Sequence, residues 1–191
     1  MNEEDIIKLI QQDEWMMNIL KTVKKLNLPD WWVGAGFIRS KIWDYLHNYK
    51  IRTPIPDIDV IYFDKSDFSK DEAEQETTSA EIKYENLLKK MMLDVNWSVT
   101  NQARAHVFHE HEPYKSAVEG LSYWVEIATC VGVKIDKNDK LILAAPRGVD
   151  DLVNLIVRPT PNSYKDTKKF EERIAKKGWL TKWPKLKVVL N

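Results

Sequence analysis

The stretch Asp57-Ile58-Asp59-Val60-Ile61-Tyr62-Phe63 decides the expected fold of this chain. Its apolar residues predict a buried strand, and the two prolines of the preceding loop, residues 50–56, exclude a helix there. Side chains two residues apart in a strand share a face, so Asp57 and Asp59 are predicted to point the same way. Neighbouring carboxylates repel each other unless a cation lies between them. Because hard oxygen ligands suit Mg²⁺, the pair predicts a metal site.

A second informative stretch, Trp32 to Arg39, reads as a strand that ends in a glycine turn and opens a helix. Helix N-termini bind phosphate, so Gly34 and Gly36 predict a phosphate site. Arg39 lies one turn into this helix and could pair with a phosphate or with Asp57. The alternatives are simple turn chemistry for the glycines, a structural salt bridge for Arg39 and a solvent-facing strand start for the aspartates.

Composition fits one globular domain. The chain has 191 residues, 43% hydrophobic and 30% charged, with 29 basic and 29 acidic side chains. Residues 64–86 carry eight acids and three bases, and residues 158–191 carry ten bases and three acids. These two segments indicate either solvated helix faces or, for the second, a basic tail that meets an anion or nucleic acid.

The cysteine content, the N-terminus and the lengths of the apolar runs indicate the cellular compartment of this protein. A single cysteine, Cys130, excludes an internal disulfide and suits a reducing cytosol. The acidic N-terminus does not resemble a signal peptide, and no apolar run is long enough to span a membrane. We therefore expect a cytoplasmic protein without a membrane partner.

Periodicity predicts an α+β domain with a mixed sheet flanked by helices. We expect one domain over 1–191, with an N-terminal helix inside residues 1–30 and a basic helical appendage over 158–191. Strands are expected at 31–34, 57–63, 95–99, 131–135 and 140–144, the last two forming a hairpin. Helices are expected at 3–26, 36–47, 71–93, 102–109, 116–127, 148–157 and 166–177.

Several stretches, in order, resemble the nucleotidyltransferase superfamily, and most closely a small bacterial family similar to the head of CCA-adding enzymes and poly(A) polymerases. They are Gly34–Ser40, Ile42-Trp43-Asp44, Pro56–Asp64, Trp97–His106, Ala145–Leu152 and Val157-Arg158-Pro159. The resemblance implies that the glycine turn holds a nucleoside triphosphate, that Asp57 and Asp59 hold Mg²⁺ or Mn²⁺, and that a nucleotidyl group is transferred.

The sequence departs from this family pattern at two points. Active members usually have a third carboxylate on a neighbouring strand, but residues 95–100 offer none; Asp94 precedes them and Asn101 follows. Asn101 could serve as a neutral ligand, or simply cap the next helix. The middle of the glycine turn is Ala35, which is tolerable if its φ is negative.

Three functions remain open. The first is a metal-dependent nucleotidyltransferase with catalytic Asp57 and Asp59, in which Asn101 and Arg104 lie near the sugar, base or third-ligand position. The acceptor is unknown and could be RNA, a protein or a small molecule. The second is a non-catalytic nucleotide-binding or regulatory module, and the third is an RNA-binding protein that uses the basic residues 165–187.

A further group of histidines and acids could suggest a metal cluster, but its spacing does not match that of zinc ligands. A polar helix end is the simpler interpretation of these residues, which are His106, His109, Glu110, His111 and Glu112.

Overall fold

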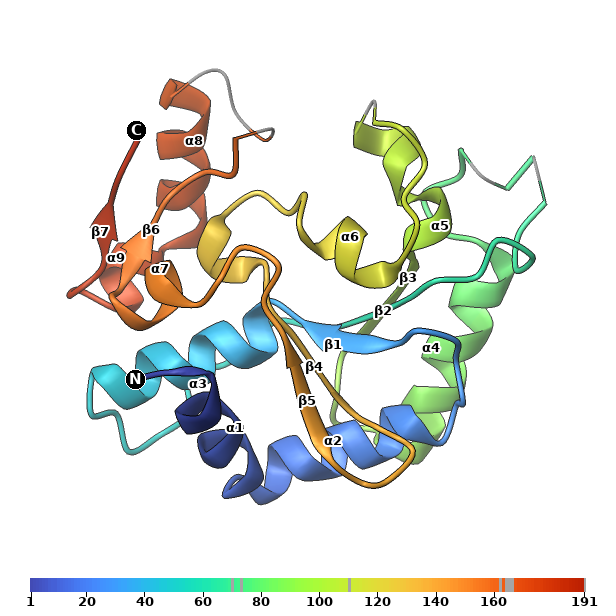
Figure 1. Cartoon of the computed structure of the whole chain (residues 1–191), viewed down its shortest axis with the longest axis horizontal. Coiled ribbons are helices and arrows are strands. Elements are labelled where there is room, and N and C mark those ends of the chain that lie inside the picture. Colours follow the sequence, from blue (N-terminus) through green and yellow to red (C-terminus); the bar gives the residue numbers. More distant parts are fainter. Residues whose placement is uncertain (70, 73, 110, 162, 164–166, 191) are drawn as a thin grey trace.

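A mixed five-stranded sheet forms the centre of the computed structural model, which describes residues 1–69, 71–72, 74–109, 111–161, 163 and 167–190 (Figure 1). The strand order is β3-β2-β1-β4-β5, in which β2 and β3 are parallel and the other neighbours are antiparallel. The predicted α+β class, mixed sheet and hairpin are confirmed. The strands are β1 (Trp32–Gly34), β2 (Ile58–Tyr62), β3 (Trp97–Asn101), β4 (Gly132–Ile135) and β5 (Leu141–Ala144).

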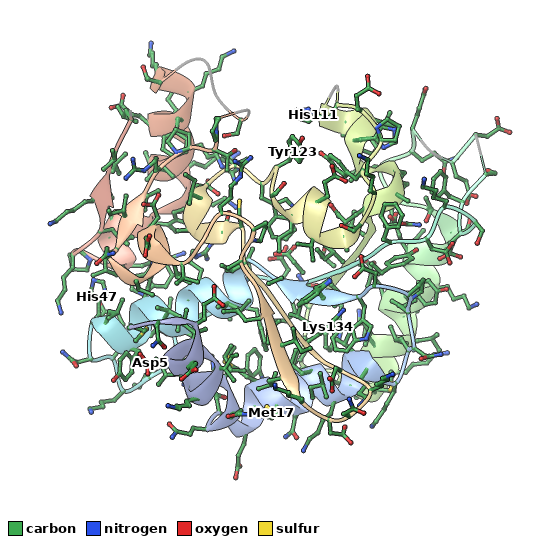
Figure 2. The ribbon with its side chains drawn as sticks, viewed as in Figure 1. Asp5, Met17, His47, His111, Tyr123 and Lys134 are labelled. Atoms are coloured by element: carbon green, nitrogen blue, oxygen red, sulfur yellow. The ribbon has the colours of Figure 1, made fainter. Side chains whose placement is uncertain are left out.

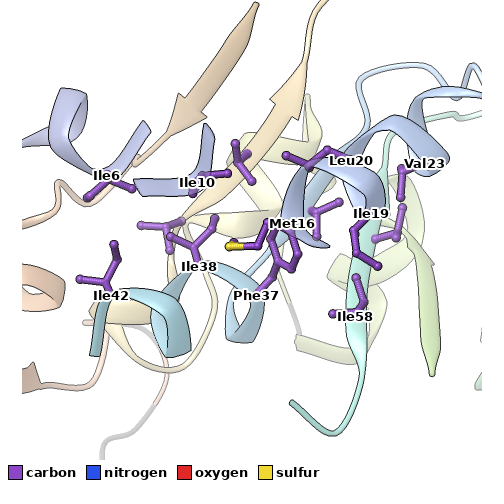
Figure 3. Close-up of a cluster of buried hydrophobic side chains, with 14 of the residues drawn as sticks. Ile6, Ile10, Met16, Ile19, Leu20, Val23, Phe37, Ile38, Ile42 and Ile58 are labelled. Carbon is purple, nitrogen blue, oxygen red and sulfur yellow. The ribbon is translucent and has the colours of Figure 1, made fainter. Parts of the chain in front are cut away.

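The two faces of the sheet are covered unequally. Ile58, Val60 and Tyr62 of β2 join a large core together with side chains from the helices α1 (Glu3–Gln11), α2 (Glu14–Lys24), α3 (Gly36–Leu46) and α4 (Ser79–Met91). Figure 3 shows the part of this core where α1 and α2 meet α3 and Ile58. On the other face Ile61 packs in a smaller cluster with α6 (Ala117–Leu121). Alternation along β2 puts Asp59 on this thinly covered face.

The expectation of one helix over 3–26 is wrong, because the chain breaks between α1 and α2. Asp13 begins the second helix by accepting a hydrogen bond from the Met16 N–H at 3.1 Å, which is the role of an N-cap. The same carboxylate pairs with Lys41 at 2.8 Å and Arg52 at 2.7 Å. Asp13 therefore ties the start of α2 to α3 and to the loop that precedes β2.

The expected helix over 71–93 is wrong in its first third, because α4 begins at Ser79. Thr78 and Glu81 form a capping box, in which each side chain accepts a hydrogen bond from the other's backbone N–H. The described residues between 71 and 78 are turns and bends, and Ala73 lies outside the described residues. The acidic half of this segment is thus a loop and not a helix face.

Three further helices are shorter than expected. The helix over 102–109 is α5 (Gln102–Ala105) followed by the 3₁₀ turn η1 (His106–His109). The helix over 116–127 is α6 alone, and the 3₁₀ turn η2 (Ile127–Thr129) follows it. The helix over 148–157 is α7 (Asp150–Val153), which stops because Leu155 has a φ of 59°; the strand β6 (Ile156–Val157) comes next.

The C-terminal segment packs against α3. The expected basic helix is α8 (Thr167–Lys177), although the proposed first residue, Asp166, lies outside the described residues. It is followed by α9 (Trp179–Lys182) and β7 (Lys187–Val188), which pairs in parallel with β6. Trp179 and Trp183 each meet the Trp43 ring edge-on, at 5.3 and 5.1 Å between centroids.

Among the described residues, no helix combines the length and apolarity needed to cross a bilayer.

Candidate active site

Asp57 and Asp59 open onto one cavity of about 700 Å³. Asp57 directly precedes β2 and Asp59 is the second residue of that strand, whereas the intervening Ile58 is buried in the main core. The structure thus brings the two carboxylates to the same side of the strand, as alternation predicts. Asp94, which the sequence offered as another nearby acid, is exposed and is not part of this cavity lining.

The electrostatics of this pair favour a bound cation. Burial, and after it the charge of Asp57, raise the pKa of Asp59 to about 7, although the charges of Arg39 and Lys177 act to lower it. The positive charge nearby therefore does not compensate both carboxylates. Among the described residues, no three His, Cys, Asp or Glu side chains form a group that could hold a metal.

The glycine turn lies where β1 ends and α3 begins. Ala35 has φ 39° and ψ −107°, so the condition under which alanine would be tolerable in this turn, a negative φ, is not met. A Cβ on Gly34 would stand 2.9 Å from the Trp124 ring, which explains the glycine there. Gly36 faces the cavity, where a Cβ would make only ordinary contacts of 3.6 Å. The start of α3 therefore reaches the same cavity as the carboxylates.

Arg39 is buried under a tryptophan cluster. Its guanidinium carbon lies 4.3 Å from the Trp179 ring centroid and 5.2 Å from that of Trp43. One terminal nitrogen donates to Ser40 at 3.3 Å, and the buried Nε has no hydrogen-bond partner among the described residues. Burial lowers the pKa of Arg39 to about 10, against the charges of Glu126 and the aspartates, so the group remains a cation at neutral pH. This cation lines the cavity.

The sequence indicated a basic tail that could meet an anion, but it did not predict that cations of α8 and α9 line the same cavity as Asp57 and Asp59. Arg173, Lys176 and Lys177 line it from α8, and Lys182 lines it from α9. Arg173, Lys176 and Lys177 are three or four residues apart and so share one helix face, and this spacing was the sequence signal that could have predicted a cationic surface.

Glu126 is another residue of this cavity that the sequence analysis did not single out. It is buried and accepts a hydrogen bond from the Nε of Arg173 at 2.7 Å. RNA binding by residues 165–187 stays a prediction, and residues 165 and 166 lie outside the described part of the chain.

Asn101 and Arg104 do not line the cavity that the two carboxylates share, and Arg104 lines a second cavity, of about 520 Å³, together with Asp59. Register pairs Asp59 with Ser98, so Asn101 belongs to the opposite face of β3. The Asn101 side chain donates to the Asp64 carbonyl at 2.6 Å and caps α5. Arg104 is buried in an ion pair with Glu81 at 2.6 Å. The described lining of the 700 Å³ cavity includes neither Asn101 nor Arg104.

Aromatic side chains form another edge of the cavity. His111 and Tyr123, labelled in Figure 2, lie side by side with ring centroids 4.4 Å apart, and both line the cavity. Tyr123 stacks in turn on Tyr114 at 5.1 Å. His106 packs against the Tyr114 ring, while Glu110 and the side chain of His109 lie outside what the structure describes. The described histidines thus pack with tyrosines.

A family model described as Nucleotidyltransferase matches residues 21–188. The chain belongs to this nucleotidyltransferase family. The resemblance that the ordered sequence stretches indicated is therefore confirmed. A structure determined by NMR and described as revealing a CCA-adding enzyme head domain is 30% identical, with a TM-score of 0.81. That comparison covers 100% of this nucleotidyltransferase chain and 97% of the other. Among curated proteins, none matches the chain.

Two CCA-adding enzymes of known structure share the fold of this nucleotidyltransferase. The Thermotoga maritima enzyme complexed with tRNA has a TM-score of 0.56 at 13% identity, covering 95% of this chain and 42% of that one. A CCA-adding enzyme in complex with CTP has a TM-score of 0.53 at 12% identity, covering 99% and 43%. The chain therefore spans less than half the length of these two enzymes, and at such identities the likeness shows the fold alone.

Proposed function

We propose that this protein binds a nucleoside triphosphate together with a divalent metal in the 700 Å³ cavity and transfers the nucleotidyl group to an acceptor. One observation carries the proposal: Asp57, Asp59 and the cationic residues of α8 line a single cavity at the start of α3. Carboxylates suit a metal ion, whereas guanidinium and ammonium groups suit phosphate oxygens. The cavity therefore joins the two kinds of group that a metal-bound triphosphate requires.

The triphosphate lies along the cationic side of the cavity in this proposal. The N-terminus of α3, at Gly36, contributes the positive end of the helix dipole. Arg39 faces the phosphates with a guanidinium that the tryptophans hold in place. Arg173 and Lys177 extend the positive charge towards the chain's C-terminal segment. Gly34 acts only indirectly in phosphate binding, because the absence of a side chain there lets the Trp124 ring approach the glycine turn.

Mg²⁺, or Mn²⁺, is the ion that we assign to Asp57 and Asp59. The fit rests on the incompletely compensated charge of this half-buried pair and on its hard oxygen donors. When bound, such an ion supplies positive charge at the reacting phosphate. The aspartates hold the ion, Arg39 orients the phosphates, and the cavity walls limit the access of water.

A second function, nucleotide binding without transfer, is favoured by one specific observation. Ser98 and Thr100 are the β3 residues that share the face of Asp59, and neither carries a carboxylate. A site with two acidic ligands holds a metal less tightly than one with three. This alternative predicts saturable binding of nucleotide and no product with any acceptor.

The test of the proposal separates binding from transfer. Each α-³²P nucleoside triphosphate is incubated with the protein, Mg²⁺ or Mn²⁺ and a cell extract, and equilibrium binding is measured in parallel without extract. Metal-dependent binding followed by labelling of an acceptor supports transfer, and binding without labelling supports the second function. Wild-type protein that binds none of the triphosphates would refute both. The acceptor and the cytoplasmic location remain proposals from the sequence.

A further inference from the structure

Asp44 of α3 carries a carboxylate that does not belong to the described lining of either cavity. The residue is buried, with 6% of its surface exposed. Within the described part of the chain it forms no ion pair. A buried carboxylate without a cation depends on hydrogen-bond donors to offset the cost of burial, so its donors show which segments it holds.

Three donors from two separate segments point at this carboxylate. The Thr53 backbone N–H donates to Oδ2 at 2.8 Å, and the Thr53 hydroxyl donates to Oδ1 at 2.6 Å. The indole N–H of Trp183, from the C-terminal segment beside α3 (Figure 1), donates to the same Oδ1 at 2.8 Å. A carboxylate accepts all three bonds, whereas an amide would turn its own N–H groups towards one of the donors.

The Thr53 contacts fix the loop that leads to Asp57. The two residues are separated by the Pro-Ile-Pro sequence of residues 54–56, all of which line the 700 Å³ cavity. Each proline ring fixes its own φ and restricts the residue before it to extended backbone. Because this connection is stiff, a displacement of Thr53 is transmitted to Asp57. Asp44 therefore influences where one of the two proposed metal ligands lies.

The Trp183 contact fixes the aromatic surroundings of Arg39. The guanidinium carbon of Arg39 lies 5.8 Å from the Trp183 ring centroid. The Trp183 ring packs edge-on against Trp43, whose centroid lies 5.2 Å from the same carbon. Trp183 directly follows α9 and lines the cavity. The indole bond to Asp44 therefore helps to hold the cation that faces the phosphates in the proposed function.

We infer that Asp44 is a positioning residue, whose carboxylate holds Asp57 and the aromatic surroundings of Arg39 in one fixed arrangement. The inference rests on the proposed function, because it assigns metal to Asp57 and phosphate to Arg39. Asp44 touches neither ligand and acts through Thr53 and Trp183. Metal affinity and phosphate affinity should therefore both depend on this one carboxylate.

Two inorganic probes report separately on the two halves of the site in the full chain. Mn²⁺ alone is titrated by electron paramagnetic resonance, in which the protein-bound ion loses the sharp signal of the free ion. Tripolyphosphate is titrated by calorimetry in the presence of EDTA, which removes divalent ions. Circular dichroism sets a common temperature at which every variant is folded.

Asp44→Asn should weaken the binding of both probes by about tenfold, because neutral acceptors bond more weakly than carboxylates and the amide N–H opposes one donor. The loss of tripolyphosphate affinity is the decisive result. Removal of a negative charge by itself would strengthen anion binding, so a long-range charge effect has the opposite sign.

Asp30→Asn is the matched control. The Asp30 carboxylate also accepts hydrogen bonds from an indole and from the backbone, at 3.1 Å from Trp32 and at 2.7 Å from the Ala117 N–H. Asp30 belongs to neither described cavity lining. The substitution removes the same charge and the same kind of contact, and it should leave both affinities unchanged.

Two single variants separate the two links. Trp183→Phe removes the indole donor and should weaken tripolyphosphate binding alone, by about threefold. Thr53→Val removes the hydroxyl donor, keeps the backbone N–H, and should weaken Mn²⁺ binding alone by a similar factor. These milder changes test the inference even where Asp44→Asn does not fold.

The double variant Asp44→Asn/Trp183→Phe should recover one half of the site. Without the indole donor, the amide can direct its N–H groups to the Thr53 hydroxyl and accept from the Thr53 backbone N–H. The Mn²⁺ affinity should therefore return close to that of wild type, while the tripolyphosphate affinity stays low. A general loss of packing would give no such selective recovery.

Three results would overturn the inference: affinities of Asp44→Asn equal to those of wild type, stronger tripolyphosphate binding by Asp44→Asn, or a double variant that binds Mn²⁺ as weakly as Asp44→Asn. These results leave the proposed function standing, since the wild type still binds both probes. If the wild type binds only one probe or neither, the proposed function is refuted and this inference with it.

Discussion

Arg173 of α8 donates a hydrogen bond from Nε to Oε1 of Glu126 at 2.7 Å, and this ion pair joins two segments that line one cavity. Glu126 is 1% exposed, and the Thr129 hydroxyl also donates to its carboxylate at 3.2 Å. Because the carboxylate is buried, loss of the Arg173 guanidinium would leave it without its cationic partner. The pair holds α8, with its other cations, against the rest of the cavity.

Replacing Arg173 by Met should lower the free energy of unfolding by about 2–3 kcal/mol, because it leaves the buried Glu126 carboxylate without its cation. This is below the value for a fully buried pair, since the Arg173 side chain is 31% exposed. Urea denaturation measures the change. The double variant Glu126→Gln/Arg173→Met should recover most of the loss, and a double variant as unstable as the single one would contradict this explanation.

Asp57→Asn and Asp59→Asn should each abolish metal-dependent triphosphate binding while the fold persists. The substitutions remove metal ligands and also relieve the repulsion between the two carboxylates. Calorimetry with Mg²⁺ and triphosphate measures the binding, and circular dichroism checks the fold. Asp94→Asn, at an exposed acid outside both cavities, is the matched control and should bind like wild type.

Arg39→Met should weaken triphosphate binding without lowering the free energy of unfolding. Loss of the guanidinium should weaken triphosphate binding by roughly 1.5–3 kcal/mol, the range for hydrogen bonds to charged groups. The free energy of unfolding should stay equal or rise, because a buried cation with an unpartnered Nε is replaced by an apolar side chain. Parallel calorimetry and denaturation distinguish the two effects, and a variant that loses stability and affinity together would indicate a structural role.

Ala35→Gly should stabilise the protein by about 1 kcal/mol. Ala35 has φ 39° and ψ −107°, where a Cβ is strained, and relief of that strain exceeds the entropy that glycine adds to the unfolded chain. Chemical denaturation measures the gain. Ala175→Gly in α8 makes the same chemical change within a helix and should instead destabilise by about 1 kcal/mol. A loss at both positions would show that Ala35 is not strained.

Asp13→Asn should flatten the acid side of the stability profile. Burial alone would raise the pKa of Asp13, but hydrogen bonds from Lys41, the Met16 N–H and Arg52 outweigh it and hold the pKa below 3.8. The folded state therefore binds fewer protons than the unfolded one, so this stabilisation is present above pH 4 and is lost as the pH falls further. Asparagine keeps the N-cap. We expect a wild-type advantage of about 2 kcal/mol at pH 7 that shrinks towards pH 2 in denaturation curves.

Local sequence patterns were sufficient to place the central strands and the carboxylate pair. The alternation around Asp59 and the glycines around Ala35 are short-range signals, so the sheet and the start of α3 follow from them. Helix lengths were overestimated where a cap or a positive φ interrupts an apolar pattern, as at Asp13, Thr78 and Leu155. Such interruptions depend on one side-chain hydrogen bond, as at Asp13 and Thr78, or on the backbone conformation of one residue, as at Leu155, and an average over the hydrophobic periodicity does not detect either.

The rest of the candidate site depends on tertiary packing that no local pattern contains. Glu126 and Arg173 are 47 residues apart in the chain. Contacts between distant segments, such as Trp179 and Trp183 against Trp43, bring the C-terminal helices to the cavity that the aspartates line. Asn101 and Arg104 illustrate the opposite case, in which a local pattern suggested a ligand site but tertiary contacts use the side chains. Asn101 caps α5, and Arg104 forms an ion pair with the buried Glu81.

The order in which the site is assembled follows from the position of α8 in the chain. Asp57, Asp59 and the glycine turn leave the ribosome long before Arg173, Lys176 and Lys177 do. A nascent chain can therefore complete its five-stranded sheet before the cations of α8 that line the cavity have been made. Under the proposed function, nucleotide binding therefore has to wait until residues 187–188 have been made, when β7 can pair with β6 beside α8 and α9.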